Sequence, residues 1–289
     1  MNIYCEFDNF ENLGTKKRDF NKKNKDFTIE KRKEKFKTTI TRININNNKI
    51  SKTLKKDIGF YITIFCEKYN YLTNDYFTFL TTILKKEINF LIDKTFLNKN
   101  KDLKYFIVGL GNYKITADTL GNNVVEKILS TTKDIENKNI SSNNFGNVFS
   151  IAPSIASKNG VYTGSIIKSL CKEFKPDIVI LIDSLTCKNI DYLGRTFQIN
   201  TSGLTPGCEI GNKQPKINKK YLKIPVISIG CPVVCNLSNL INTSKYDPVL
   251  TLKDIDIAIV KYAEIIAFAL NNIIHKNLTE KEIIFLTKQ

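Results

Sequence analysis

The stretch FIVGLGNYKITADTLGNNVVEKIL, residues 106–129, predicts a strand, a turn and an amphipathic helix in direct succession. The apolar run at its start is short and rich in β-branched residues, as in a buried strand. After the turn, Leu120 and Val124 repeat at the four-residue spacing of one helix face. Asp118 lies at the expected start of that helix, seven residues past Gly111. The unit therefore places an acidic side chain just after a strand.

The glycines of this turn do not complete a nucleotide-binding motif. Gly109 and Gly111 fit the first two positions of the dinucleotide fingerprint, but Lys114 occupies the third glycine position. The phosphate-binding loop pattern of nucleoside triphosphatases is also absent from the sequence. A fixed carboxylate beside a helix N-terminus would repel a phosphate group. We therefore interpret the turn as one that holds an acid.

The same alternation of strand and helix continues along the chain. The segments NVFSIAP (147–153), PDIVILID (176–183) and KIPVISIG (223–230) are short, apolar and β-branched, and helical patterns follow them. The last of these helices is predicted over residues 253–275. Such alternation builds a parallel sheet with helices on both sides. The predicted fold class is α/β, a three-layer domain with a mostly parallel sheet and helices on both faces.

The region before this alternation is predicted to be β-rich. KTTITRINI (37–45) and IGFYITIFC (58–66) alternate their side chains as half-buried strands do, and we expect them to pair. A helix follows over residues 73–95, with candidate caps from Thr73 to Asp75. The residues predicted to face the core from this helix are Phe77, Leu80, Leu84, Ile88 and Leu91.

Composition favours a globular protein of a reducing compartment. The chain has 289 residues, 42% of them hydrophobic, which suffices for a substantial core. No stretch approaches the roughly 18 uninterrupted apolar residues of a membrane span, so we expect a cytoplasmic protein. Seven cysteines, an odd number, do not indicate a disulfide framework. Cys231 and Cys235 lack the spacing of a zinc ribbon or a redox pair; we expect buried or edge thiols, with a soft-metal role as the alternative.

The formal net charge of +16 is concentrated at the front of the chain. Residues 1–60 hold 16 Lys or Arg against 8 Asp or Glu, which is a net +8 and half of the total. Residues 16–37 show neither clean periodicity nor turn chemistry, so we expect a mobile, solvated extension. The alternative is an arm that binds a polyanion. The predicted organisation is a lysine-rich extension over residues 1–35 and a single α/β domain over residues 36–289.

Asp118 and Asp183 each follow a strand of the predicted sheet, and right-handed crossovers place the carboxyl ends of parallel strands on one edge. Two carboxylates that meet there would repel each other, so one would stay charged while the other kept a proton. The structural alternatives are an N-cap role for Asp118 and capping or pairing for Asp183. His275, in the predicted terminal helix, is the only histidine, so we expect neither a Ser-His-Asp triad nor a zinc site with two histidines within one chain. We expect His275 at the surface or at a helix end.

Four segments together resemble a known family. They are VGLGNYKITADTLGNNVVEKIL, FSIAPSIASKNGVYTGSIIKSL, KPDIVILIDSLTCKNIDYLGRTFQINTSGLTPGCEIGNKQ and IPVISIGCPVV. In this order they resemble the signature blocks of the germination proteases, endopeptidases that degrade small acid-soluble spore proteins when bacterial spores germinate. The resemblance covers roughly residues 36–235, and the segment GLTPGCEIGNK, residues 203–213, is its most distinctive part.

The resemblance implies an atypical aspartic endopeptidase with a fold similar to that of the hydrogenase maturation proteases. The two essential aspartates of the family carry over to Asp118 and Asp183, and no cofactor and no metal is implied. A metal-assisted reaction is the alternative, because relatives of that fold bind a metal with acids in comparable places. The resemblance also suggests that a glycine-rich loop lines the same cleft and binds substrate, through Gly203, Pro206, Gly207, Gly211 and Asn212.

The family further implies a zymogen with a short N-terminal propeptide, a homotetramer and a location in the spore core. The motif that follows the propeptide in the family is matched here only by Arg18 and Asp19. Direct binding of nucleic acid is not required for this function. Two rival functions are a related sporulation protein without protease activity that acts as a binding module, and a nucleic-acid-associated factor that uses the lysine-rich front.

Overall fold

The computed structural model describes residues 27–67, 73–96, 102–141, 143–155, 160–207, 214–237 and 248–287. All of the described strands belong to one sheet. They are β1 (Phe27–Glu34), β2 (Thr38–Ile45), β3 (Gly59–Cys66), β4 (Lys104–Gly109), β5 (Asn147–Ile151), β6 (Ile178–Cys187), β7 (Thr196–Asn200), β8 (Val226–Asn236) and β9 (Val249–Thr251). Their order across the sheet is β1-β2-β3-β7-β8-β6-β4-β5, and β9 pairs with β8.

Helices connect most of these strands. The described α-helices are α1 (Asn48–Leu54), α2 (Asn74–Thr95), α3 (Leu120–Val125), α4 (Thr132–Glu136), α6 (Thr163–Phe174), α7 (Lys219–Leu222), α8 (Ile255–Ile274) and α9 (Glu280–Leu286). Two short 3-10 helices complete the set, η1 (Thr116–Asp118) and η2 (Ile190–Tyr192). The predicted helices over residues 73–95 and 253–275 are confirmed as α2 and α8, and α6 follows β5 as the alternation predicts.

The sheet has a parallel and an antiparallel half. Strands β5, β4, β6 and β8 run parallel to one another, whereas every pairing that involves β1, β2, β3, β7 or β9 is antiparallel. The prediction of a mostly parallel sheet is therefore wrong in extent. The cause is β7, which returns antiparallel beside β8 and joins the β-rich N-terminal strands to the parallel strands.

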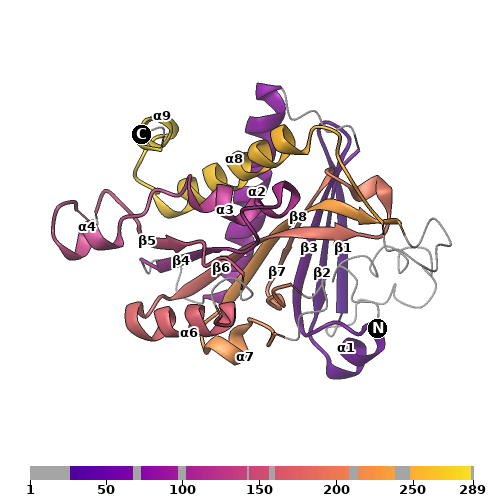
Figure 1. Cartoon of the computed structure of the whole chain (residues 1–289), viewed down its shortest axis with the longest axis horizontal. Helices are drawn as coiled ribbons and strands as arrows, with labels where there is room; N and C mark the ends of the chain where they lie inside the picture. The colour runs from indigo at the N-terminus through magenta and orange to yellow at the C-terminus, as the bar shows by residue number, and fades with distance from the viewer. Residues whose placement is uncertain are drawn as a thin grey trace.

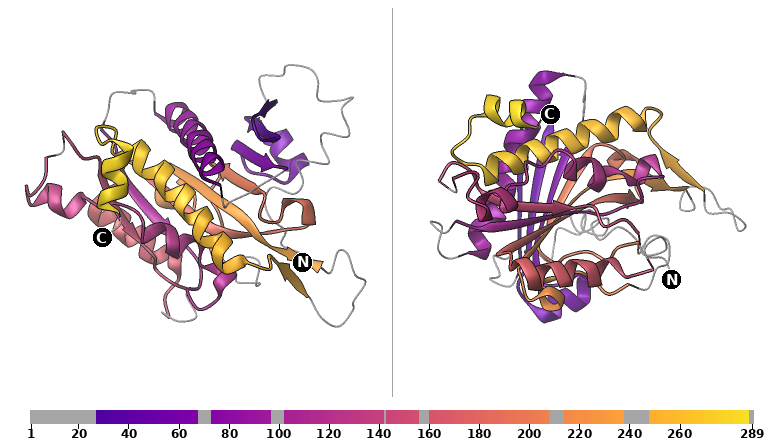
Figure 2. Two further views of the ribbon diagram at one scale, coloured as in Figure 1. Left: turned by 90° about the horizontal axis from the view of Figure 1, so that it is seen from above. Right: turned by 60° about the vertical axis from the view of Figure 1, so that its left-hand side comes forward.

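Helices cover both faces of the sheet, as Figures 1 and 2 show, so the three-layer prediction is confirmed. Helices α2, α3 and α8 lie on one face and bury the larger core cluster, which we call the α8-side core. Helices α6 and α7 lie on the opposite face over a second cluster, the α6-side core. By length and composition α8 would suffice to cross a membrane, but 72% of its most apolar window is buried against the rest of the protein. It is the central helix of the α8-side core.

The first described strand corrects the predicted boundary of the N-terminal extension. The extension was expected to reach residue 35, yet β1 pairs with β2 along all eight of its residues. Phe27 at its start is buried, and it packs with residues of β2, β3 and α1. The sequence of β1 did not indicate a strand, because it consists mainly of charged residues. An edge strand has few apolar residues that would mark it as a strand. Residues 1–26 lie outside the described residues.

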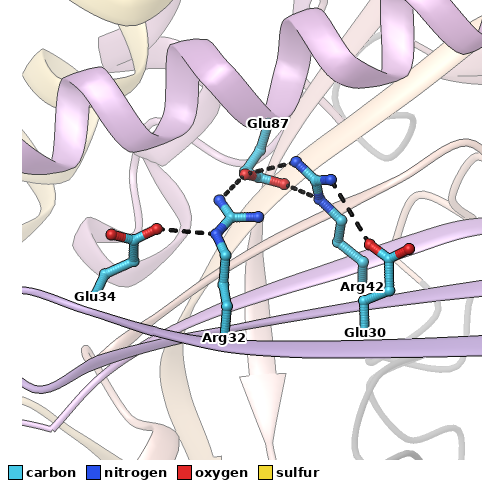
Figure 3. Close-up of polar contacts among 5 residues, drawn as sticks. All are labelled: Glu30, Arg32, Glu34, Arg42 and Glu87. Atoms are coloured by element: carbon cyan, nitrogen blue, oxygen red, sulfur yellow. Dashed lines mark hydrogen bonds and ion pairs between the residues drawn. The ribbon is translucent and has the colours of Figure 1, made fainter.

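A buried carboxylate ties β1 and β2 to α2 (Figure 3). The side chain of Glu87 in α2 is 0% exposed and accepts hydrogen bonds from Arg32 of β1 and Arg42 of β2. The Arg42 Nε–Glu87 Oε2 distance is 2.6 Å. The Arg42 guanidinium also lies over the Phe90 ring, 3.8 Å from its centroid. Two cations therefore neutralise one buried anion at the junction of the helix and the edge of the sheet.

His275 ends α8 and is fully buried, so the expected position at a helix end is confirmed and the surface position is wrong. Its Nε2 lies 3.0 Å from the carbonyl oxygen of Leu129. Because a carbonyl only accepts, Nε2 carries the hydrogen and donates. The other ring nitrogen, Nδ1, is buried without a hydrogen-bond partner among the described residues. Burial lowers the pKa of His275 to about 4. The hydrogen bond to Leu129 has a smaller effect in the opposite direction and raises the pKa.

This depressed pKa predicts a loss of stability in mild acid. The unfolded chain binds a proton at His275 below about pH 6.5, while the folded chain resists protonation until about pH 4. Stability contributed by the neutral ring is therefore present above pH 6.5 and is lost as the pH falls toward 4. Between pH 7 and pH 4.5 we expect the free energy of unfolding to fall by about 2 to 3 kcal/mol more than in His275→Gln. Urea unfolding at a series of pH values measures this, and parallel pH dependences for the two proteins would contradict it.

Candidate functional site

Three glycines allow η1 and α3 to fold closely onto the end of β4. A Cβ atom at Gly121 would overlap the backbone of Leu110, and one at Gly109 would overlap the backbone of Gly121. A Cβ atom at Gly111 would overlap the carbonyl oxygen of Asp118, and Gly111 has a φ of +120° that side-chain-bearing residues rarely adopt. The turn that the sequence singles out therefore needs glycine in order to bring Asp118 back against the strand it follows.

Asp118 ends η1 and is half-buried. Its Oδ2 accepts a hydrogen bond from the backbone N–H of Asn112 at 2.7 Å. Burial raises the pKa of Asp118 above the ordinary carboxyl value, although the Asn112 hydrogen bond acts in the opposite direction. The carboxyl group can therefore retain a proton at a pH at which an exposed aspartate is ionised. This is the property expected of a general acid or of one member of a proton-sharing pair.

Asp183 lies within β6 rather than at its end, which corrects the sequence prediction. The strand continues to Cys187 because β8 pairs with it over the same length, with Asp183 opposite Gly230. On the other side the ladder between β6 and β4 stops at the pair Ile182–Gly109. Asp183 is half-buried and lies one residue past that last pair. It therefore lies where β6 loses its pairing with β4, although not where β6 itself ends.

The structure brings Asp118 and Asp183 to the end of the same strand, β4. The backbone N–H of Leu110 donates to the carbonyl of Ile182 at 2.8 Å, which extends the ladder and places Leu110 beside Asp183. The next residue, Gly111, is the one against which the Asp118 carboxyl group lies. Helix η1 also contacts β6. Asp118, from the turn after β4, and Asp183, from the middle of β6, therefore both lie by the end of β4.

The two side chains approach this place from different faces of the sheet. Side chains alternate along a strand; Leu181 belongs to the α6-side core and Ile182 to the α8-side core, so Asp183 shares the face of Leu181. Asp118 follows Ala117, which packs against the α8-side core. Beyond the end of β4, no described strand continues along that side of β6, so no strand separates the two faces of the sheet there. Gly111, which has no side chain, lies at this gap in the sheet.

The loop after β7 lies on the face that Asp183 shares. Gly203 has a φ of +78°, and Leu204 forms an antiparallel bridge with Ile217 across the loop. Leu204 and Ile217 both belong to the α6-side core together with Leu181. Within the same loop Pro206 is buried and Gly207 is half-buried. The remaining predicted substrate-binding residues, Gly211 and Asn212, lie outside the described residues.

The cysteines of the described residues are core residues, as expected, and none forms a disulfide. All are buried: Cys66, Cys171, Cys187, Cys231 and Cys235. Burial raises the pKa of Cys66 and Cys171 to about 11 each, which disfavours the reactive thiolate. Within the described parts of the chain, no group of three or more His, Cys, Asp or Glu side chains is arranged to hold a metal ion.

The fold and the site define an α/β protein with two acidic residues at the end of one strand. A family model described as germination protease matches residues 8–247. The chain belongs to the germination protease family, which confirms the family indicated by the sequence segments.

Several curated germination proteases are similar to the chain. That of Clostridium tetani is 34% identical over 204 residues, which is 70% of this chain and 62% of the relative. Those of Oceanobacillus iheyensis and Bacillus mycoides are 34% and 32% identical, over 63% and 71% of this chain and 50% and 56% of theirs. The chain thus spans less than two thirds of the length of these relatives. A solved nickel–iron hydrogenase maturation protease, HycI from Thermococcus kodakarensis, is 19% identical with a TM-score of 0.36, covering 60% of this chain and 96% of that chain.

Proposed function

We propose that the protein is an aspartic endopeptidase that degrades small acid-soluble spore proteins during germination, with Asp118 and Asp183 as its catalytic residues. Membership of the germination protease family supports the reaction and the substrate. The observation that supports the two residues is their convergence at the end of β4, where Leu110 lies beside Asp183 and Gly111 lies against Asp118. A pair of carboxyl groups at one site can carry both proton transfers of peptide hydrolysis.

In the proposed mechanism the two carboxyl groups share one proton, because two neighbouring carboxylates do not both stay ionised. The ionised member removes a proton from a water molecule as the water oxygen bonds to the scissile carbonyl carbon. The protonated member hydrogen-bonds to the carbonyl oxygen and then supplies a proton to the leaving amine as the carbon–nitrogen bond breaks. The raised pKa of Asp118 is compatible with its holding the shared proton in the resting enzyme. Either residue can fill either role.

The loop after β7 is proposed to position the substrate. Leu204 of this loop packs on the face of the sheet that Asp183 shares. The proposed loop site comprises its neighbours Gly203, Pro206 and Gly207, with Gly211 and Asn212 further along the sequence. Glycines expose backbone N–H groups, which can hydrogen-bond to an extended peptide or to the developing oxyanion. An extended, largely unstructured substrate chain suits such backbone recognition.

Cleavage of a purified small acid-soluble spore protein tests this function. We expect the wild-type protein to cut it and Asp118→Asn and Asp183→Asn each to slow cutting by about 10³-fold or more, since each removes one proton transfer. Thermal unfolding of both variants controls for loss of the fold. Cutting at the wild-type rate by either folded variant would contradict the assignment. Loss of cleavage with a chelator, restored by a divalent ion, would support the metal-assisted alternative instead.

The family also supports proposals about assembly and location. We propose a homotetramer in the spore core that arises from a longer precursor by removal of an N-terminal segment. Sedimentation of the purified protein tests the tetramer, and the N-terminal sequence of protein from spores tests the processing. A wild-type protein that binds the spore protein without cutting it would instead identify a binding module.

A further inference from the structure

Two buried polar atoms in α3 and β6, the elements next to η1, have no hydrogen-bond partner among the described residues. They are Oδ1 of Asn122 in α3 and the hydroxyl oxygen of Ser184 in β6. Buried polar groups in folded proteins are nearly always paired, so each exception calls for a physical explanation. One of these atoms is an acceptor and the other belongs to a group that both donates and accepts. They are therefore chemically complementary to a small polar molecule placed between them.

Asn122 belongs to the helix that directly follows Asp118. It is the third residue of α3, which begins two residues after Asp118 ends η1. Gly121 packs its backbone directly against Leu110, so α3 begins on the end of β4. Helix α3 also contacts β6. The side chain of Asn122 therefore extends from the same close-packed turn that holds Asp118 at the strand end.

Ser184 lies on the side of β6 from which η1 and α3 approach. It is two residues after Ile182 of the α8-side core, and side chains two apart along a strand share a face. The extended β4–β6 ladder places Leu110 beside Asp183, one residue before Ser184. A Cβ atom at the next residue, Gly111, would lie 3.1 Å from Oδ1 of Asp118. The serine hydroxyl is thus on the face of β6 that η1 and α3 approach, one residue past the end of the ladder.

Resting on the proposed function, we propose that Asn122 and Ser184 are positioning residues that hold the attacking water beside the aspartate pair. The Ser184 hydroxyl donates to one lone pair of the water, and one water hydrogen is donated to Oδ1 of Asn122. The second water hydrogen points to Asp118, which shares this face and takes the proton when it is the ionised member of the pair, as the new carbon–oxygen bond forms. The remaining lone pair faces the scissile carbonyl carbon. A buried water with three such partners has the usual number of hydrogen bonds.

Kinetics of single substitutions test the positioning role. We expect Asn122→Ala and Ser184→Ala each to lower kcat by about 10-fold to 100-fold while KM changes less than about twofold, because water placement affects the chemical step and not substrate binding. Ser184→Thr keeps a hydroxyl and should recover part of kcat. The matched control is Asn123→Ala, which removes the neighbouring amide that donates to Thr119 at 3.2 Å and should leave kcat unchanged.

A high-resolution crystal structure of the wild-type chain tests the same claim without activity. A water within hydrogen-bonding distance of both Asn122 Oδ1 and Ser184 Oγ supports the proposal, and a direct hydrogen bond between these side chains overturns it. Unchanged kcat in both alanine variants of an active enzyme also overturns it. If the wild-type protein cuts no spore protein, the proposed function fails, and the crystallographic result alone decides whether the two residues bind water.

Discussion

Replacing Glu87 with glutamine is expected to lower the free energy of unfolding by about 3 kcal/mol, the lower end of the range for breaking a buried ion pair. The carboxylate is 0% exposed and is the common acceptor for Arg32 and Arg42. Glutamine has nearly the same shape but no charge, so both guanidinium groups lose their buried counter-ion and keep only the more exposed Glu34 and Glu30. Their side chains are 31% and 16% exposed, and this partial contact with solvent keeps the cost from the upper end of the range.

The loss of stability in Glu87→Gln should be largest at the edge of the sheet. Among the described strands, β1 has only β2 as a neighbour, and Arg32 forms an ion pair that links β1 to α2. We therefore expect amide hydrogens of β1 to exchange faster in Glu87→Gln than those of β4 or β6. Urea unfolding followed by circular dichroism gives the global value, and hydrogen exchange gives the local one.

The matched control is Glu67→Gln, which breaks the ion pair between Glu67 and Lys37. Those side chains are 56% and 59% exposed, and exposed pairs contribute little, within about 1 kcal/mol. If the Glu87 and Glu67 variants lose the same small amount of stability, the buried cluster in Figure 3 does not anchor the edge strands.

Replacing Gly111 with alanine is expected to reduce cleavage by about 100-fold or more, because an error of about 1 Å in a catalytic group has effects of that size. The new Cβ atom would overlap the carbonyl oxygen of Asp118 and crowd its Oδ1. Alanine at a φ of +120° is also strained, at a cost of about 1 to 3 kcal/mol. The turn must therefore shift, and the Asp118 carboxyl group shifts with it.

Gly160→Ala separates displacement of Asp118 from backbone strain alone. Gly160 also has a positive φ, +67°, but a Cβ atom there would meet no atom within 4 Å. We expect this variant to lose about 1 kcal/mol of stability and to keep its cleavage rate. Wild-type cleavage by Gly111→Ala would show that the proposed reaction does not depend on where this turn holds Asp118.

The parts of the fold that the sequence predicts well are those with strong local patterns. The strands and helices around residues 106–129 and 176–183 follow from short apolar runs and helical spacing, which depend on neighbours in sequence. The position of β7 could not be predicted in this way. Its antiparallel pairing with β3 and β8 is a long-range contact, and it determines how much of the sheet is parallel.

The edge strand β1 and the ion cluster around Glu87 were not predicted, and both omissions have the same cause. Glu87 lies three residues after Leu84 and four before Leu91, on the apolar face predicted for the helix. A carboxylate on such a face requires partners. One of its partners, Arg32, belongs to the tract that was interpreted as a mobile extension, so the charges within residues 27–34 indicate pairing rather than solvation.

The candidate site was predictable in part. Asp118 and Asp183 follow apolar runs, and an acid in that position is a recognisable signal. Asn122 and Ser184 carry no such signal, because they are ordinary polar residues in the sequence. They become candidates because each has a buried polar atom without a hydrogen-bond partner among the described residues. This burial results from the packing of α3 against β6, which the sequence alone does not show.

The central claim is that Asp118 and Asp183 act as one unit, and the cleavage rate of the double variant Asp118→Asn/Asp183→Asn tests it most directly. Measured beside the two single variants on the same spore protein, the double variant should cut about as slowly as the slower single variant, because residues that act together are strongly non-additive. If instead the two single losses multiply in the double variant, the aspartates act independently and the shared-proton mechanism is contradicted.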